Sequence, residues 1–223
     1  MANADKDGAP GLEPDGCRVP AVGHVYIRLS GFGLRLVPYG PCAFSRSGST
    51  PSSVVVTCQT GEGPVSTVVG GSVRESTPGV VDVLPGPAHE YWLAETTWFS
   101  FAWPEGFDLC APPAGEGPTP FRLTKPGGAE IFPQGPQSTT SLPTGGNWAA
   151  PGQELVTQYR VEDIDVCELA YDHEDSPWWQ THWAVPVGAN SSLVMTGQAP
   201  AADAHIVRSA IGEIIDTMGP TQT

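Results

Sequence analysis

The stretch that decides the fold is Trp178–Met218, which reads WWQTHWAVPVGANSSLVMTGQAPAADAHIVRSAIGEIIDTM. Trp183, Val185 and Val187 fall on one side of an alternating pattern in its first part, and this period of two is typical of a half-buried strand. A Gly-Ala-Asn turn then separates them from a second strand-like run. After that turn the apolar residues change to helical spacing, at Ala204, Val207, Ile211, Ile214, Ile215 and Met218. The stretch therefore predicts two strands that lead into one amphipathic helix.

The rest of the chain predicts short strands joined by turns and loops. Gly and Pro supply 27 and 24 of the 223 residues, so a helix is hard to place outside the last stretch. Strand-like runs include Val54–Cys58, Leu155–Val161 and Ile164–Tyr171, and Phe121–Phe132 reads as a hairpin around Pro-Gly-Gly. Gln134–Gly152 is predicted to be a long loop. The predicted fold class is α+β: β-rich, with antiparallel sheets, many Gly/Pro loops and one C-terminal amphipathic helix.

This pattern predicts three regions along the chain. Residues 1–19 are polar and rich in Gly, Pro and Asp, which is typical of a flexible acidic arm. Residues 20–90 predict an all-β region, because no helical period occurs there. Residues 91–223 predict an antiparallel sheet followed by the C-terminal helix.

Residues 97–218 carry a resemblance to a known fold group. A strand with a Trp-Pro-x-Gly-Phe turn is followed by short hairpins, a Tyr-containing strand and a strand that bears Trp179 and Trp183. A strand of the type Ser192–Thr196 and the terminal helix complete the series. This order resembles the PsbP-like α/β/α fold, from which the chain differs in lacking a clear helix before or between its first strands. Members of that group are mostly binding or assembly factors, so the resemblance implies a binding role and transfers no catalytic residue.

Charge and composition exclude several classes of function. The formal net charge is −14 with only 10 Lys and Arg residues and no basic cluster, which argues against nucleic-acid binding and against anionic membrane surfaces. The first twenty residues hold no apolar run, so we expect no signal peptide and a cytoplasmic protein. The 5 cysteines show no C-x-x-C spacing, no Gly-rich loop precedes a helix, and no Gly-x-Ser-x-Gly motif occurs. The sequence thus predicts no metal site, no cofactor and no enzyme.

A dense acidic segment is the strongest candidate for a binding site. It holds seven carboxylates and no basic residue, at Glu162, Asp163, Asp165, Glu168, Asp172, Glu174 and Asp175. One interpretation is a docking face for a basic protein, whose association such a charge would steer. The alternative is a solvated hairpin edge, where charges prevent sheets from joining edge to edge.

Aromatic and imidazole side chains lie close to this segment in the sequence. Trp178 and Trp179 are candidate partner anchors, as is Trp148, and the alternative is that they fill a sparse core. His173 stands among the acids and His182 follows nine residues later, so a divalent metal site is a further hypothesis. Acidic and His residues before a proline are more often turn residues, and we favour that interpretation.

The function predicted from these observations is a non-catalytic acidic protein-binding module. A bacterial immunity protein or a secretion-system accessory factor would fit, with another, basic protein as the partner. The first alternative is a structural subunit of a phage or capsid-like particle, since arms and long loops suit such assemblies and the sequence also allows a homo-oligomer. The second alternative is a hydrolase that uses acidic residues near Trp178 and Trp179.

Overall fold

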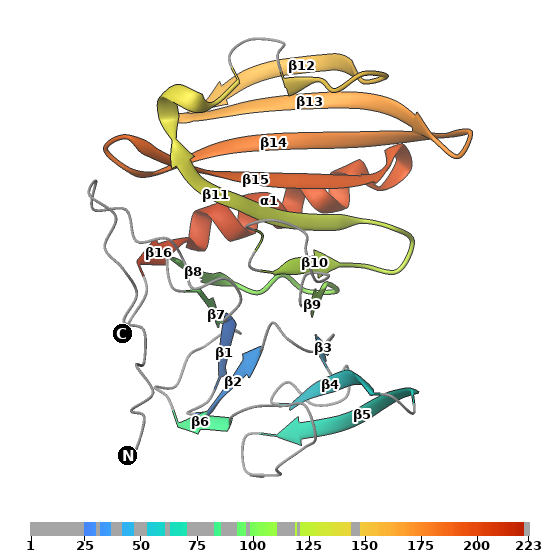
Figure 1. Cartoon of the computed structure of the whole chain (residues 1–223), viewed down its shortest axis with the longest axis vertical. Coiled ribbons are helices and arrows are strands. Elements are labelled where there is room, and N and C mark those ends of the chain that lie inside the picture. The colour runs from blue at the N-terminus through green and yellow to red at the C-terminus, as the bar shows by residue number, and fades with distance from the viewer. Residues whose placement is uncertain are drawn as a thin grey trace, which may run out of the picture.

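The computed structural model describes residues 25–29, 32–36, 42–46, 53–60, 63–70, 83–85, 93–96, 99–110, 119, 121–143 and 148–220. Within these ranges the strands form two antiparallel sheets, and one α-helix follows the last long strand (Figure 1). This confirms the predicted fold class, a β-rich α+β protein with a single C-terminal helix among the described residues.

The larger sheet has ten strands in the order β12-β13-β14-β15-β11-β10-β9-β3-β4-β5. Its long hairpins lie at one end of the order, where β12 forms the edge. In chain order its strands are β3 (Cys42–Arg46), β4 (Ser53–Thr60), β5 (Gly63–Gly70), β9 (Asp108–Cys110), β10 (Arg122–Thr124), β11 (Glu130–Ser138), β12 (Glu154–Val161), β13 (Ile164–His173), β14 (Ser176–Gly188) and β15 (Ser191–Pro200).

The smaller sheet has six strands in the order β16-β8-β7-β1-β2-β6. They are β1 (Val25–Leu29), β2 (Phe32–Leu36), β6 (Val83–Pro85), β7 (Leu93–Glu95), β8 (Phe99–Ala102) and β16 (Gly219–Pro220). Both sheets therefore combine strands from the predicted regions 20–90 and 91–223, because β3–β5 extend the larger sheet and β1, β2 and β6 extend the smaller one. The predicted arm, residues 1–19, lies outside the described residues.

The predicted loop Gln134–Gly152 begins as a strand. β11 continues to Ser138 and pairs with β15 on both sides of a register shift between Gln134 and Gln137. Gly135 and Pro136 lie inside this shift. The ladder of hydrogen bonds is already broken there, so it tolerates a glycine with φ of +104° and a proline without an N–H group. The Gly and Pro residues predicted a loop, and pairing with β15 outweighs that local preference.

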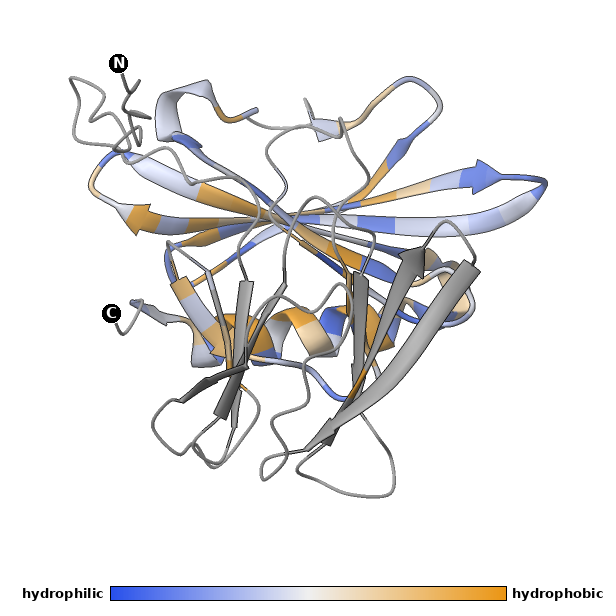
Figure 2. Cartoon of the chain, turned by 60° about the horizontal axis from the view of Figure 1, so that its bottom comes forward, coloured by the Kyte–Doolittle hydropathy of each residue, from blue (hydrophilic) through white to orange (hydrophobic). Residues whose placement is uncertain are grey.

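The core lies where the helix α1 (Ala204–Thr217) rests against both sheets. A short 3-10 turn, η3 (Ala201–Asp203), leads into α1, and a second, η1 (Thr139–Ser141), follows β11. The helix contacts β15, β14 and β11 of the larger sheet and β8 of the smaller one. Orange hydrophobic and blue hydrophilic segments alternate along this helix in Figure 2. The buried helix residues are Val207, Ala210, Ile211 and Ile214. Three of them belong to the predicted apolar stripe, and Ala210 lies outside that prediction.

Gly197 in β15 marks the closest approach between α1 and the sheet. A Cβ atom there would lie 2.5 Å from Cγ1 of Val207 and 2.6 Å from Cδ1 of Ile211. We expect Gly197→Ala to lower the free energy of unfolding by about 1–3 kcal/mol, because an added methyl group in a filled core forces the helix or its side chains to move. Urea denaturation followed by circular dichroism measures the change.

Gly212, on the same helix, provides the matched control. A Cβ atom there would meet nothing within 4 Å beyond its chain neighbours and the backbone of its own helix. Gly212→Ala should therefore raise the free energy of unfolding, by about 0.5–1 kcal/mol, because alanine favours the helix. An unchanged stability for Gly197→Ala would contradict the close packing of α1 on β15.

Candidate functional site

The structure divides the acidic segment between the two ends of β13. The β12–β13 turn holds Glu162 and Asp163, and the β13–β14 turn holds Glu174 and Asp175. Because β13 pairs antiparallel with both neighbours, these turns lie at opposite ends of the sheet (Figure 1). Ten extended residues span about 30 Å. Asp165 falls near the first turn and Asp172 near the second, and these six carboxylate residues are all exposed.

A pocket opens at the β12–β13 end of the sheet. Its volume is about 480 Å³. The predicted partner-binding residues Glu162 and Asp163 contribute to it, and apolar side chains from three other parts of the chain form most of the remaining lining. We call this the acidic pocket; it is lined by Phe99, Glu162, Asp163, Ile164, Val185, Pro186, Val187, Ile215, Met218, Gly219 and Pro220.

The C-terminal end of α1 adds negative potential to the acidic pocket. The helix ends at Thr217, and Ile215 and Met218 from this end line the pocket. A helix C-terminus carries a partial negative charge, which a basic side chain normally offsets. The last turn of α1 has no basic residue, and Glu213 and Asp216 stand there instead. A cation bound at this end of the helix would offset its partial negative charge.

The β12–β13 turn holds its carboxylates free. Glu162 has φ of +54°, a left-handed conformation that costs a non-glycine residue about 1–2 kcal/mol. Arg160 supports the turn by donating from Nε to the carbonyl oxygen of Glu162 (3.2 Å) and from Nη2 to that of Asp163 (3.4 Å). Its only ion pair among the described residues is a loose one to Asp165, at 3.8 Å. The carboxylates of Glu162 and Asp163 have no described partner and remain available to a ligand.

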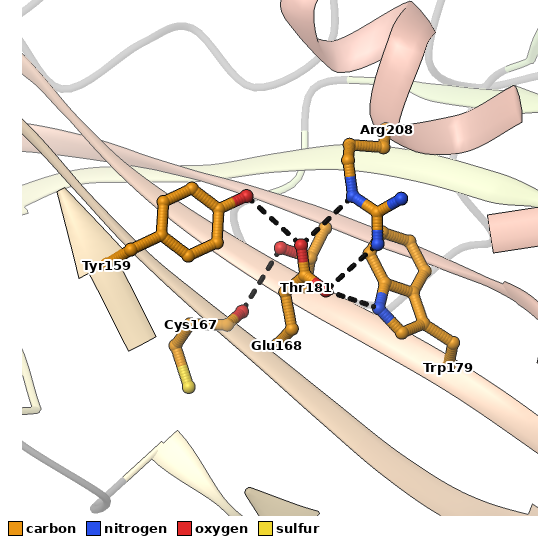
Figure 3. A network of polar contacts seen from close by, with 6 residues as sticks. All are labelled: Tyr159, Cys167, Glu168, Trp179, Thr181 and Arg208. Carbon is orange, nitrogen blue, oxygen red and sulfur yellow. Dashed lines mark hydrogen bonds and ion pairs between the residues drawn. The ribbon is translucent and has the colours of Figure 1, made fainter. Parts of the chain in front are cut away.

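Glu168 does not belong to the exposed acidic surface, which corrects the prediction from the sequence. Its side chain is buried on the face of β13 that α1 covers (Figure 3). Its carboxylate accepts hydrogen bonds from the hydroxyl of Tyr159 (3.0 Å) and from Nε1 of Trp179 (3.1 Å). Arg208 on α1 donates two more, from Nε at 3.0 Å and from Nη2 at 2.9 Å. The two bonds from Arg208 tie the helix to the sheet, and the bonds from Tyr159 and Trp179 come from the neighbouring strands β12 and β14.

The environment of Glu168 keeps its carboxylate ionised. Burial pulls the pKa of Glu168 upward, but the hydrogen bonds from Arg208, Trp179 and Tyr159 outweigh burial, and its pKa lies below the ordinary value. With four donors in place, the carboxylate has little capacity left for a substrate or for proton transfer. Glu168 is therefore suited to anchoring the helix rather than to general acid catalysis.

The three tryptophans considered as partner anchors have different surroundings. Trp179 is only 6% exposed and lies beneath the guanidinium of Arg208, 5.0 Å from ring centroid to Cζ, so the prediction of a partner anchor is corrected to a core residue. Trp178 is half-buried and stands over Gly128, at the far end from the acidic pocket. Trp148 is half-buried and stacks on His182, with ring centroids 5.0 Å apart.

The candidate metal residues do not come together. His173 pairs with Ser176 at the β13–β14 turn, whereas His182 pairs with Cys167 six positions along the same ladder. Across the described ranges, no group of three or more His, Cys, Asp and Glu side chains is placed to hold a metal ion. Burial raises the pKa of the Cys167 thiol, which disfavours the nucleophilic thiolate form.

A hydrogen-bonded chain through His182 was not predicted from the sequence. Thr196 donates to Oε1 of Gln134 at 3.3 Å, so its hydroxyl accepts from Nδ1 of His182, 3.0 Å away. In the neutral ring the proton therefore lies on Nδ1. Burial lowers the pKa of His182 from 6.5 to about 4. His182 and Thr196 lie opposite each other on the neighbouring strands β14 and β15. The only sign of this contact in the sequence is that each residue stands at an alternating position of its strand.

Comparisons with known proteins identify no family for this chain. No family model matches the chain, and no curated protein matches it. A solved structure, the crystal structure of LpqN, involved in cell envelope biogenesis of Mycobacterium tuberculosis, aligns with a TM-score of 0.29 and 11% sequence identity. The alignment covers 55% of this chain and 83% of LpqN. So low a score carries no argument about fold or function, and the resemblance to the PsbP-like group remains a prediction.

None of the helices in the described part of the chain has both the length and the apolar character needed to cross a bilayer.

Proposed function

We propose that this protein is a non-catalytic, acidic protein-binding module that grips a basic protein at the acidic pocket. One observation carries the proposal. The carboxylates of Glu162 and Asp163, which have no described partner, and the C-terminal end of α1, whose negative charge no basic side chain offsets, meet at one pocket with an apolar lining. A role as a cytoplasmic bacterial immunity protein or a secretion-system accessory factor agrees with the net charge of −14. The resemblance to the PsbP-like group, mostly binding or assembly factors, supports the same class.

The pocket favours a side chain that is apolar along its length and positively charged at its tip. Arg and Lys have this form, because their methylene stems bury against apolar atoms while the charged head stays near carboxylates. Ile164 and Val185 are buried, and Ile215 and Met218 are half-buried, so the pocket offers apolar contact. Each 100 Å² of apolar surface removed from water there contributes about 2.5 kcal/mol before the costs of association.

The hydrolase alternative has less support. Glu168 is the acidic residue in contact with Trp179, and its carboxylate is ionised and fully hydrogen-bonded. A general acid needs the opposite, a raised pKa and a free proton. The carboxylates near Trp178 are exposed, Asp172 near the end of β13 and Glu174 and Asp175 in the turn that follows.

We test the proposal with a random peptide display library panned on the purified protein. The selected peptides should carry Lys or Arg beside a large apolar residue, and their binding should weaken as salt rises, because exposed charges are screened. We expect the double variant Glu162→Gln/Asp163→Asn to bind them at least about tenfold more weakly, since it removes two carboxylates that face the ligand. Fluorescence anisotropy with the synthetic peptides measures the affinities.

The far turn supplies the matched control. Glu174→Gln/Asp175→Asn removes the same charge from the same strand pair, about 30 Å away. Its affinity for the selected peptides should stay within about twofold of the unmodified protein, because the charges lie beyond a Debye length. Equal losses in both double variants would reduce the effect to net charge, and selection of neutral or acidic peptides would overturn the proposal.

A further inference from the structure

β12 is an edge strand whose outer side has no partner in the described part of the sheet. It stands first in the strand order and pairs only with β13. In an antiparallel pair, alternate residues direct their N–H and C=O groups away from the neighbouring strand. A row of such groups is a template for another strand.

The edge carries few of the usual protective devices, and the one present is a β-bulge between Leu155 and Thr157, near the start of the strand. β12 contains no Lys and no Pro, the residues that most often prevent an extra strand from adding. Its one basic residue, Arg160, is turned back onto the carbonyl oxygens of its own turn. Along this strand Leu155, Val156 and Val161 are 46%, 57% and 42% exposed. An exposed apolar edge of this kind calls for a covering partner.

We propose that the basic partner binds as an added strand along β12, with one of its side chains in the acidic pocket. This rests on the proposed function and names the form in which the partner is recognised. The edge leads directly into Glu162 and Asp163, so a chain extended along it reaches the pocket at its end. Main-chain hydrogen bonds would supply affinity and the pocket would supply the preference for a cationic side chain.

Charge selects a basic segment over a second copy of this chain. Each copy carries a net charge of −14, so two edges brought together would repel. Glu154 begins the edge, and Glu162 and Asp163 follow its end. A positively charged extended segment meets carboxylates at both ends of the strand.

The register of the hairpin identifies the amides that would bind. Val161 and Ile164 close a two-residue turn and form its hydrogen-bonded pair. By alternation, Arg160 and Gln158 direct their backbone groups away from β13, toward the added strand. The amide of Gln158 lies near the middle of the edge, and its side chain is exposed.

The first experiment uses the tightest-binding peptide from the display selection with single N-methyl groups placed along its backbone. Strand addition predicts a period of two: methylation of every second amide weakens binding about tenfold or more, and methylation of the amides between leaves it within about twofold. Binding that declines evenly, or not at all, overturns strand addition.

The second experiment changes the protein. We expect Gln158→Pro to weaken the unmethylated peptide about tenfold, because it removes one outward N–H group, whereas Gln158→Ala, which removes only the side chain, should bind normally. Proline is tolerated at an edge, and circular dichroism checks the fold. If Gln158→Pro fails to fold, the methylation series on the unmodified protein decides the question.

The outcomes separate the two proposals. Loss of binding in Glu162→Gln/Asp163→Asn without the period of two leaves the proposed function standing and overturns strand addition. No selected peptide at all overturns both. Light scattering that shows a dimer converted to a monomer by Gln158→Pro assigns the edge to a second copy and overturns the basic partner.

Discussion

Replacing Glu168 with alanine is expected to lower the free energy of unfolding by about 3 kcal/mol at neutral pH. The substitution removes the acceptor of four hydrogen bonds and leaves the buried N–H group of Trp179 without a partner. Arg208 is 42% exposed, so water takes over part of its solvation and the loss falls at the lower end for a broken buried ion pair. Chemical denaturation measures the change.

Two further variants define the origin of this loss. Asp165→Ala lies on the same strand with its side chain 59% exposed, and its effect should stay within about 0.5 kcal/mol. Glu168→Gln keeps an oxygen acceptor and loses the charge, so its loss should be smaller than that of Glu168→Ala. A change below about 1 kcal/mol for Glu168→Ala would contradict a role in holding the helix on the sheet.

The carboxylate of Glu168 should also make the stability of the protein depend on pH in the acid range. Its folded pKa is depressed, so its contribution is complete above the ordinary glutamate pKa of about 4.3 and is lost as the pH falls through the lower folded value. Glu168→Gln should lack this decline. The loss of stability in Glu168→Ala and the decline in acid together distinguish an ionic anchor from a packing defect, because a cavity alone gives no dependence on pH.

The helix and the hairpins were predictable because each is encoded locally. The spacing from Ala204 to Met218 predicts the helix observed at Ala204–Thr217, and the Pro-Gly-Gly turn predicts the β10–β11 hairpin. The second half of β11 was not predictable from local sequence. Its Gly-Pro step indicates a loop, and only the distant β15 supplies the pairing that makes it a strand.

The site was predictable in part, and the main error of the prediction, the placement of Glu168, has a physical cause. Counting carboxylates placed Glu168 on a surface, although a period of two puts it on the same face as Ile164 and Val166, both buried. Applied strictly, that alternation identifies Glu168 as an inward residue that needs a partner. Its partner Arg208 lies 40 positions away on another element. The acidic pocket was beyond prediction for the same reason, since its apolar lining comes from strand ends and a helix end far apart in the sequence.

His182 should make the protein lose stability between pH 6.5 and about pH 4, by about 3 kcal/mol in total. Burial beneath Trp148 disfavours the imidazolium, so the folded state keeps the ring neutral while the unfolded chain takes up a proton. The depressed pKa means that this stability is complete above the ordinary pKa of 6.5 and declines as the pH falls toward the folded value of about 4. Urea titrations at half-unit steps measure the slope.

Two variants and one direct measurement check the assignment. His182→Asn keeps a donor near the position of Nδ1 and does not titrate, so its stability should be nearly flat between pH 6.5 and 4.5. Trp148→Leu uncovers the ring and should raise the pKa of His182 toward its ordinary value, which makes the decline shallower. NMR titration of the imidazole protons, assigned by the loss of one signal in His182→Asn, reports the pKa itself. A His182 signal that titrates near 6.5 in the unmodified protein would show that the ring is solvated, and Trp148 would then not cover it in solution.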